Sequence, residues 1–295
     1  MIVNWRNFMR KTFLGFLVVF QLFFVNASAQ TVSKEVLAKK VIKISGIERM
    51  IEAIPAQVAN QLFQEKMFSE KPEVIEKASV IADKLFDLKI AKDQFLRHFI
   101  ENATTEELGD ILNWLETPLG KRISKAEIDA ETLEGQKKMQ KYLENLDSPS
   151  NDRIQLMLKF EKEAKITDKL LRFLKLMMVG MVEVGSEVFP NKEEKTPEQI
   201  QEELEQVWKG MEPVMRKLYW KIMVLNSHYI YKDFSNAEIE SYIIFLKSET
   251  GEKFNTLGMD GTFKIFDSFM KSFFKEVFQL LQAHKNEEEG VKATP

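Results

Sequence analysis

Apolar residues recur every three or four positions through long parts of this chain, and this spacing constrains the fold more than any other feature. The first such stretch runs from Val36 to Leu62, and similar stripes run over 74–100, 154–188, 200–231 and 263–281. This period places apolar side chains on one face of a helix. The 295 residues include only 12 glycines and eight prolines, and no segment alternates convincingly with period two. We therefore predict an all-α protein, folded as a helical bundle.

The first 29 residues have the composition of a cleaved secretory signal peptide. Three basic residues precede the apolar run 12–25, and an Ala-Ser-Ala triplet ending at Ala29 follows it. This order of positive start, apolar centre and A-x-A site is typical of secretion signals. The apolar run is shorter than the roughly 20 residues of a membrane-spanning helix, although an uncleaved anchor is the alternative. We expect cleavage after Ala29, no transmembrane anchor afterwards, and a periplasmic or secreted location in a bacterium.

The charge of the remaining chain argues against a nucleic-acid partner. Cleavage removes three of the 42 lysines and arginines and none of the 45 acidic residues, which leaves 39 bases, 45 acids and a formal net charge of −6. A negative protein offers little to a phosphate backbone. The chain has no cysteine, so disulfides, thiolate metal sites and an N-terminal lipidated cysteine are excluded.

Polar breaks predict the domain organisation. The stretch "NLDSPSND" at 145–152 concentrates turn-forming residues between two helical regions. In the break at 189–199, Thr196 has the position of a helix N-cap, Pro197 of the first helical residue, and Gln199 of the partner in a capping box. The expected segments are a first helical repeat at 30–146, a linker at 147–153, a second helical repeat at 154–284 and a flexible polar tail at 285–295.

A short motif occurs twice and suggests that the bundle consists of two related multi-helix halves in tandem. "NWLETPLGKR" at 113–122 resembles "IFLKSETGEK" at 244–253, and the preceding residues also correspond when Gly120 is aligned with Gly251. Chemical class is kept in the pairs Thr104 and Ser235, Glu107 and Glu238, Trp114 and Phe245, Thr117 and Ser248, Gly120 and Gly251, and Arg122 and Lys253.

Capping and close packing account for the conserved chemistry of these pairs. Thr104 and Ser235 are expected to cap a helix together with the glutamate three residues later. Thr117 and Ser248 would then cap the following helix. The glycine three residues after each of these caps would let the second helix approach the end of the first. The predicted structure is a tight αα-hairpin, and a ligand-binding role for the paired residues is the alternative.

The repeated stretch resembles the signature of an exported bacterial family known as domain of unknown function 2059. The resemblance rests on an S/T-x-x-E-L/I helix followed by F/W-L-x-S/T-x-x-G-K/R. It implies an all-helical body behind a signal peptide, in two tandem copies at 35–145 and 154–282, and it brings no activity. Glu252 stands where the family has lysine, and Gly109 lies inside the first helix of the motif.

The sequence offers little support for catalysis. Its histidines are His98, His228 and His284, with no H-E-x-x-H motif and no E-x-x-H pair. His98 has Glu101 one helical turn away, which is more typical of a structural pair than of a site. We therefore predict no enzyme activity, no cofactor and no metal site.

Two apolar segments are candidate contact surfaces. Methionines 177, 178 and 181 surround Gly180, and methionine is frequent at adaptable binding surfaces. The segment 263–281 carries a wide apolar face. Burial in the protein's own bundle is the favoured interpretation, followed by a second chain and then by a lipid-like guest. The candidate surface consists of Met177, Met178, Met181, Phe266, Phe269 and Phe273.

Three functions remain as hypotheses. The leading one is a non-enzymatic interaction or envelope-maintenance module, with a protein partner or self-association. The second is a carrier or sensor of an apolar, lipid-like ligand held by the Phe-rich and Met-rich helices. The third is carboxylate-based catalysis, for which no convergent acids are evident in the sequence.

Overall fold

The computed structural model describes residues 33–64, 72–146, 150–188 and 196–292, and this part consists of helices without any strand. The all-α prediction is therefore confirmed. The predicted signal peptide lies outside the described residues. Helices from both predicted halves belong to one compact unit, Lys34–Pro295. Among the helices described, none combines the length and hydrophobicity needed to cross a bilayer.

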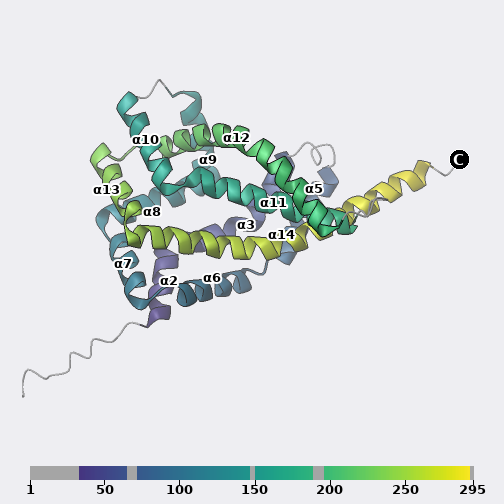
Figure 1. Ribbon diagram of the computed structural model, residues 1–295, viewed down its shortest axis with the longest axis horizontal. Helices are drawn as coiled ribbons and strands as arrows, with labels where there is room; N and C mark the ends of the chain where they lie inside the picture. Colours follow the sequence, from purple (N-terminus) through teal and green to yellow (C-terminus); the bar gives the residue numbers. More distant parts are fainter. Residues whose placement is uncertain (1–32, 65–71, 147–149, 189–195, 293–295) are drawn as a thin grey trace, which may run out of the picture. The chain divides into compact units, whose positions relative to one another are not determined.

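Seven helices are described in the N-terminal half, residues 34–146 (Figure 1). The stripes at 36–62 and 74–100 are each interrupted once, because Gly46 and Asp87 end one helix and begin the next. The helices are α2 (Lys34–Ile44), α3 (Ile47–Gln64), α5 (Pro72–Leu85), α6 (Leu88–Asn102), α7 (Thr105–Leu115), α8 (Pro118–Glu131) and α9 (Leu133–Glu144).

Five helices are described in the C-terminal half, and the last of them is longer than the sequence indicated. The segment 263–281 is only part of a helix of 44 residues that starts directly after the second corner. The helices are α10 (Asn151–Ala164), α11 (Ile166–Val188), α12 (Pro197–Ile230), α13 (Asn236–Lys247) and α14 (Glu249–Lys292).

Two predicted boundaries need correction. The linker was placed at 147–153, but Ser150 accepts a hydrogen bond from the Arg153 amide and caps α10, which begins at Asn151. A serine at the N-cap stabilises the start of a helix by accepting a hydrogen bond from one of its free amides. The tail was predicted to be flexible from 285, yet α14 continues to Lys292. Lysine and glutamate are good helix formers, so a polar composition does not by itself end a helix.

One hydrophobic core, core 1, combines the N-terminal half with the last helix. It contains side chains of α2, α3, α5, α6 and α7 together with nine residues of α14. Figure 1 shows α14 passing between α6 on one side and α11 on the other, and it contacts both. The apolar face of α14 is thus covered by the protein's own bundle, as predicted. The nine residues are Leu257, Ile265, Phe266, Phe269, Met270, Phe273, Phe274, Val277 and Phe278.

A second core, core 2, lies mainly in the C-terminal half. Its buried residues come from α10, α12 and α13, from Tyr231 and Phe234 between α12 and α13, and from Ile123 of α8 in the N-terminal half. Trp114 and Phe254 pack against both cores. Each core is therefore completed by the helix that follows the corner of the other half, so the halves do not have separate interiors.

Candidate functional site

The first corner has the predicted capping geometry. The Glu107 amide donates to Thr104 Oγ1 at 3.1 Å, and the Thr104 amide donates to Glu107 Oε2 at 2.6 Å, which closes a capping box at the start of α7. After α7 ends, Thr117 accepts from the Gly120 amide at 2.9 Å and caps α8, with Pro118 as its first residue. Both caps thus lie at the residues that the sequence indicated.

The second corner has the same geometry with serine in place of threonine. Ser235 and Glu238 form the capping box of α13. Ser248 then accepts from the Gly251 amide at 3.1 Å at the start of α14. Its hydroxyl also donates to the Phe245 carbonyl oxygen at 2.6 Å, as Thr117 does to Trp114 at 2.7 Å.

Both corner glycines are required by close backbone contact. A Cβ atom on Gly120 would overlap the carbonyl oxygen of Trp114, and one on Gly251 would overlap that of Phe245. Neither oxygen can withdraw, because each belongs to a helix end that the corner itself holds in place. Both glycines are buried. The polar groups of the corners are thus engaged in ending and starting helices.

A third corner of the same kind was missed in the sequence. Thr132 accepts from the Gly135 amide at 3.0 Å between α8 and α9, and a Cβ on Gly135 would overlap the Asp129 carbonyl oxygen. The signal was the threonine three residues before a glycine in "TLEG" at 132–135. It went unnoticed because no aromatic residue precedes it at the position of Trp114.

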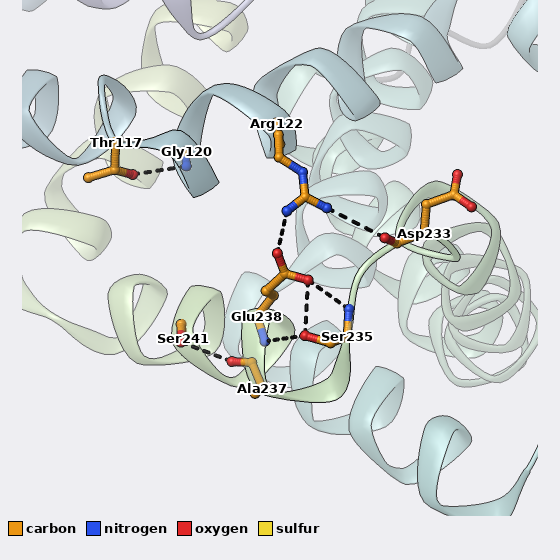
Figure 2. Close-up of polar contacts among 8 residues, drawn as sticks. All are labelled: Thr117, Gly120, Arg122, Asp233, Ser235, Ala237, Glu238 and Ser241. Carbon is orange, nitrogen blue, oxygen red and sulfur yellow. Dashed lines mark hydrogen bonds and ion pairs between the residues drawn. The ribbon is translucent and has the colours of Figure 1, made fainter.

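The first two corners lie against each other and exchange equivalent contacts. Trp114 stacks on Phe245 with ring centroids 3.8 Å apart and an interplanar angle of 11°. Arg122 pairs with Glu238, and Figure 2 shows its guanidinium lying between that carboxylate and the Asp233 carbonyl oxygen. Lys253 pairs with Glu107 at 3.0 Å in the reciprocal contact.

The pairing changes the protonation behaviour of both capping glutamates. The Thr104 amide and then Lys253 hold the pKa of Glu107 below its ordinary value. The Ser235 backbone and hydroxyl, followed by Arg122, lower the pKa of Glu238. Each glutamate therefore joins a helix start in its own half to a cation in the other half.

A buried polar cluster lies beside the corners, around Glu127 of α8. Tyr231 and Tyr242 donate from their hydroxyl groups to Glu127 Oε1 at 2.6 Å and 3.0 Å. Burial raises the pKa of Glu127, against the two hydrogen bonds and the charge of Lys169. Burial likewise lowers the pKa of Lys169 to about 8. The sequence analysis did not identify this cluster, because its members are scattered over several helices and match no motif.

His98 has a different hydrogen-bonding neighbour from the one that the sequence suggested. It is buried on α6, and its Nδ1 lies 3.1 Å from the Asn102 side-chain amide. Glu101, the neighbour suggested by the sequence, acts on His98 through its charge. Burial and the charge of Lys264 lower the pKa of His98. His98 also lines an open groove of about 700 Å³ between α6, α11 and α14, which includes Arg172 and Phe263. No residue of the predicted corners or apolar surface lines this groove.

The predicted Met and Phe surface lies largely inside the protein. Phe266, Phe269 and Phe273 are buried in core 1, and Met177 and Met181 pack against that core from α11. Met178 is partly buried. These residues are brought together with core 1 and do not form an open contact surface. Within the described residues, no cluster of three or more histidines and acids has metal-ligand geometry.

The exposed apolar residues concentrate instead on α12, where no contact surface was predicted. One side of the helix carries six large apolar residues whose exposed fractions range from 36% to 71%. Leu204 and Trp208, which are buried against the bundle, lie along one edge of this side at 100° per residue. Trp220 is also exposed but lies on a different side of the helix. We call the exposed set the α12 stripe, and it consists of Val207, Met211, Val214, Leu218, Ile222 and Leu225.

The fold and the corners define an all-helical protein whose repeated motif serves helix termination and packing. Residues 90–146 match the model of the family described as "Uncharacterized protein conserved in bacteria (DUF2059)". The match begins within α6, extends through α9 and includes the first corner, so the predicted resemblance is confirmed for this region. Comparisons with curated proteins and with solved structures give no match.

Proposed function

We propose that this protein is an exported bacterial helical module that acts without chemistry, by binding a protein partner through the α12 stripe. The observation that carries the proposal is the stripe itself. Soluble proteins rarely leave several large apolar side chains contiguous and exposed unless another molecule covers them. The bundle uses its other conspicuous apolar helix, α14, for its own core. The α12 stripe is therefore the surface best suited to a partner.

The local chemistry of the motif supports a structural rather than a catalytic role. The hydroxyls of Thr117 and Ser248 accept from glycine amides and donate to carbonyl oxygens. Glu107 and Glu238 are engaged by backbone amides and by cations. Groups engaged in this way hold the corners together and are poorly placed to transfer protons to a substrate.

Photo-crosslinking in the producing bacterium tests the proposal. A benzophenone amino acid at Val214, in the middle of the α12 stripe, should give a discrete protein adduct in the periplasmic or secreted fraction. The matched control is Ile244 of α13, which is 69% exposed but lies outside the stripe. The absence of an adduct at Val214, or equal adducts at both positions, would count against a partner on α12. Recovery of the protein only from the cytoplasm would count against export.

A second candidate function is suggested by the groove at His98. Leu176, Val179 and Phe263 give it an apolar wall. Its cations stand beside acids, since Arg172 pairs with Asp260 and Lys175 pairs with Glu205. The apolar wall suits a lipid-like ligand that the protein would carry or sense. Native mass spectrometry of gently purified protein tests this candidate, because a carrier retains a stoichiometric ligand and Leu176→Glu should release it.

We also propose that the two halves are tandem copies of one ancestral unit. The salt bridges Arg122 to Glu238 and Lys253 to Glu107 exchange positions that correspond when the two corner motifs are aligned on their glycines. Such reciprocal pairing is what a two-fold interface between identical units produces. The connection between the first two described helices of each half supports the same view. Gly46, between α2 and α3, has a φ of +84°, and Lys165, between α10 and α11, has a φ of +53°. These are the two positive-φ residues of the described chain.

A further inference from the structure

We propose that the partner of the α12 stripe is a second copy of this chain, with the two α12 helices paired antiparallel. This inference rests on the proposed function, since it names the partner of that same surface. It would make the protein a homodimer whose two-fold axis passes near the middle of the stripe, between Val214 and Leu218.

The spacing of the stripe fits a helical partner of equal length. Its residues follow each other at intervals of 4, 3, 4, 4 and 3. At 100° per residue these positions fall within an arc of about 80°. The pattern has a hendecad repeat, from Val207 to Leu218 and from Val214 to Leu225. This period is close to that of an undistorted helix, so a helix pair built on it supercoils only slightly. From Val207 to Leu225 the stripe is about 27 Å long.

The charges along α12 favour an antiparallel copy of the same helix. Residues 197–213 include five glutamates and one lysine, whereas residues 214–230 include three basic residues and no acid. In an antiparallel pair centred at residue 216, the glutamates at 198–205 of each helix lie opposite residues 227–234 of the other, so they do not meet a second set of glutamates. A parallel pair would place like charges together along its whole length, and avoiding this repulsion favours the antiparallel orientation. Within each chain, Arg216 is already paired with Asp168 and Glu212, and Glu205 with Lys175.

The same charge distribution disfavours a membrane surface as the occupant. An interfacial helix carries its basic residues along the whole polar face. Here Val207 and Met211 lie in the acidic half of α12, beside Glu203 and Glu205. Anionic lipid headgroups would repel that half, although the basic half with Lys217 and Lys221 would suit them.

The oligomeric state of the purified protein is the first test. Light scattering after size-exclusion chromatography should give twice the mass of one chain. Leu218→Glu places a charge in the seam and should raise the dissociation constant of the dimer by about 30-fold or more, the change expected at a central interface residue. Because Leu218 is 55% exposed in the single chain, the variant should keep its helical content. Its melting temperature should match that of the wild type only at concentrations at which both are monomeric. The control Ile244→Glu, on a comparably exposed apolar residue of α13, should leave the dimer unchanged.

Cysteine crosslinking then tests the orientation. Because the natural chain has no cysteine, only the introduced residues can form a disulfide. A mixture of Val207→Cys and Leu225→Cys chains should form an intermolecular disulfide, since these positions meet in an antiparallel pair. Each variant alone should crosslink poorly, because its two copies lie about 27 Å apart. Crosslinking of each single variant with itself would indicate a parallel pair and overturn the proposed geometry.

Failure of this inference can be distinguished from failure of the proposed function. A monomer at all concentrations, together with a Val214 photo-adduct to a different protein, overturns the second copy and leaves the proposed function standing. A monomer without any adduct overturns both. A monomer that floats with vesicles of anionic phospholipid through α12, and loses this with Leu218→Glu, identifies a membrane surface and also overturns the second copy.

Discussion

Gly251 lacks the Cβ atom that would prevent the start of α14 from lying so close to the end of α13. The residue lies in the first turn of α14, where a side chain would overlap the Phe245 carbonyl oxygen. We expect Gly251→Ala to lower the free energy of unfolding by about 1–3 kcal/mol, as overpacking against fixed atoms does. Chemical denaturation of the purified variant measures it. An unchanged midpoint would contradict the steric role of this glycine.

Gly109 provides the matched control for that substitution. It also lies in a helix, but a Cβ there would meet nothing within 4 Å. Gly109→Ala should therefore stabilise the protein by about 0.5–1 kcal/mol through helix propensity alone. Opposite signs for the two glycines separate close packing from propensity.

Glu127 predicts a defined pH dependence. Burial raises its pKa above the ordinary value of 4.5, so the folded state holds this proton more tightly than the unfolded state does. The resulting stability is fully present below pH 4.5 and is lost as the pH rises through the raised pKa. Glu127→Gln removes this loss and keeps an oxygen for Tyr231 and Tyr242. The variant should gain stability relative to the wild type as the pH rises above 4.5.

Denaturant titrations at several pH values measure this difference. Comparing variant with wild type cancels the contributions of the buried histidines, His98 and His228. Glu131 and Lys169 respond to the charge of Glu127, so the difference reports on the cluster around Glu127 as a whole. The exposed Glu134→Gln is the control, since its side chain is 69% accessible and lies away from the cluster. A difference between Glu127→Gln and wild type that stays constant with pH would show that Glu127 does not titrate in this range.

At the scale of the elements, the contact of the two corners joins α7 to α13. The stack of Trp114 on Phe245 is the central contact between these corners. Stacked aromatic pairs contribute about 0.5–1.5 kcal/mol beyond their buried area. We expect Trp114→Leu and Phe245→Leu to be non-additive by that amount in a double-mutant cycle. The pair Trp114→Leu and Phe173→Leu should be additive, because Phe173 packs on Phe266 instead.

The elements also show what the sequence could and could not predict. Helix identity, the capping boxes at Thr104, Thr196 and Ser235, and the corner glycines follow from local chemistry, which acts within about four residues. Helix ends that depend on tertiary packing do not follow from it. The continuation of α14 from Glu249 to Lys292 through Gly258 and Gly261 is one case, since core 1 holds that helix together.

The sequence likewise predicts only some features of the candidate site. Pairing of Trp114 with Phe245 was visible as a sequence repeat, but their stacking was not, because the repeat does not indicate how its copies pack. The α12 stripe was included in a predicted apolar helix, yet its exposure depends on which neighbours cover it. Lone polar residues such as Glu127 have no sequence signal at all, since their partners are far away along the chain.

At the scale of the whole molecule, the shared cores make the halves inseparable. Nine side chains of α14 belong to core 1. Each buried side chain of this size contributes about 1.5–3 kcal/mol, and together they outweigh the roughly 5–15 kcal/mol by which a domain is stable. A fragment of residues 34–146 should therefore lack a cooperative unfolding transition in circular dichroism. Addition of residues 150–292 should restore one.

The full chain is the control, and it should unfold in one transition by circular dichroism and by tryptophan fluorescence. A fragment that melts cooperatively on its own would mean that the N-terminal half completes its core without α14. Two separate transitions in the full chain would equally contradict the shared interior.

The position of α14 also determines when the nascent chain can complete core 1 during synthesis. Phe95 and Phe99 are made early, but Phe278, the last buried α14 side chain of core 1, is made only after nearly all of the C-terminal half. At about 5–20 residues per second, the ribosome needs roughly 8–30 s to extend the chain from Leu115 to that residue. During this interval the N-terminal helices expose the hydrophobic surface that α14 later covers, and they are vulnerable to aggregation. A polypeptide that cannot finish folding until its end is synthesised is also still loose enough to be threaded through an export channel, in agreement with the proposed secretion.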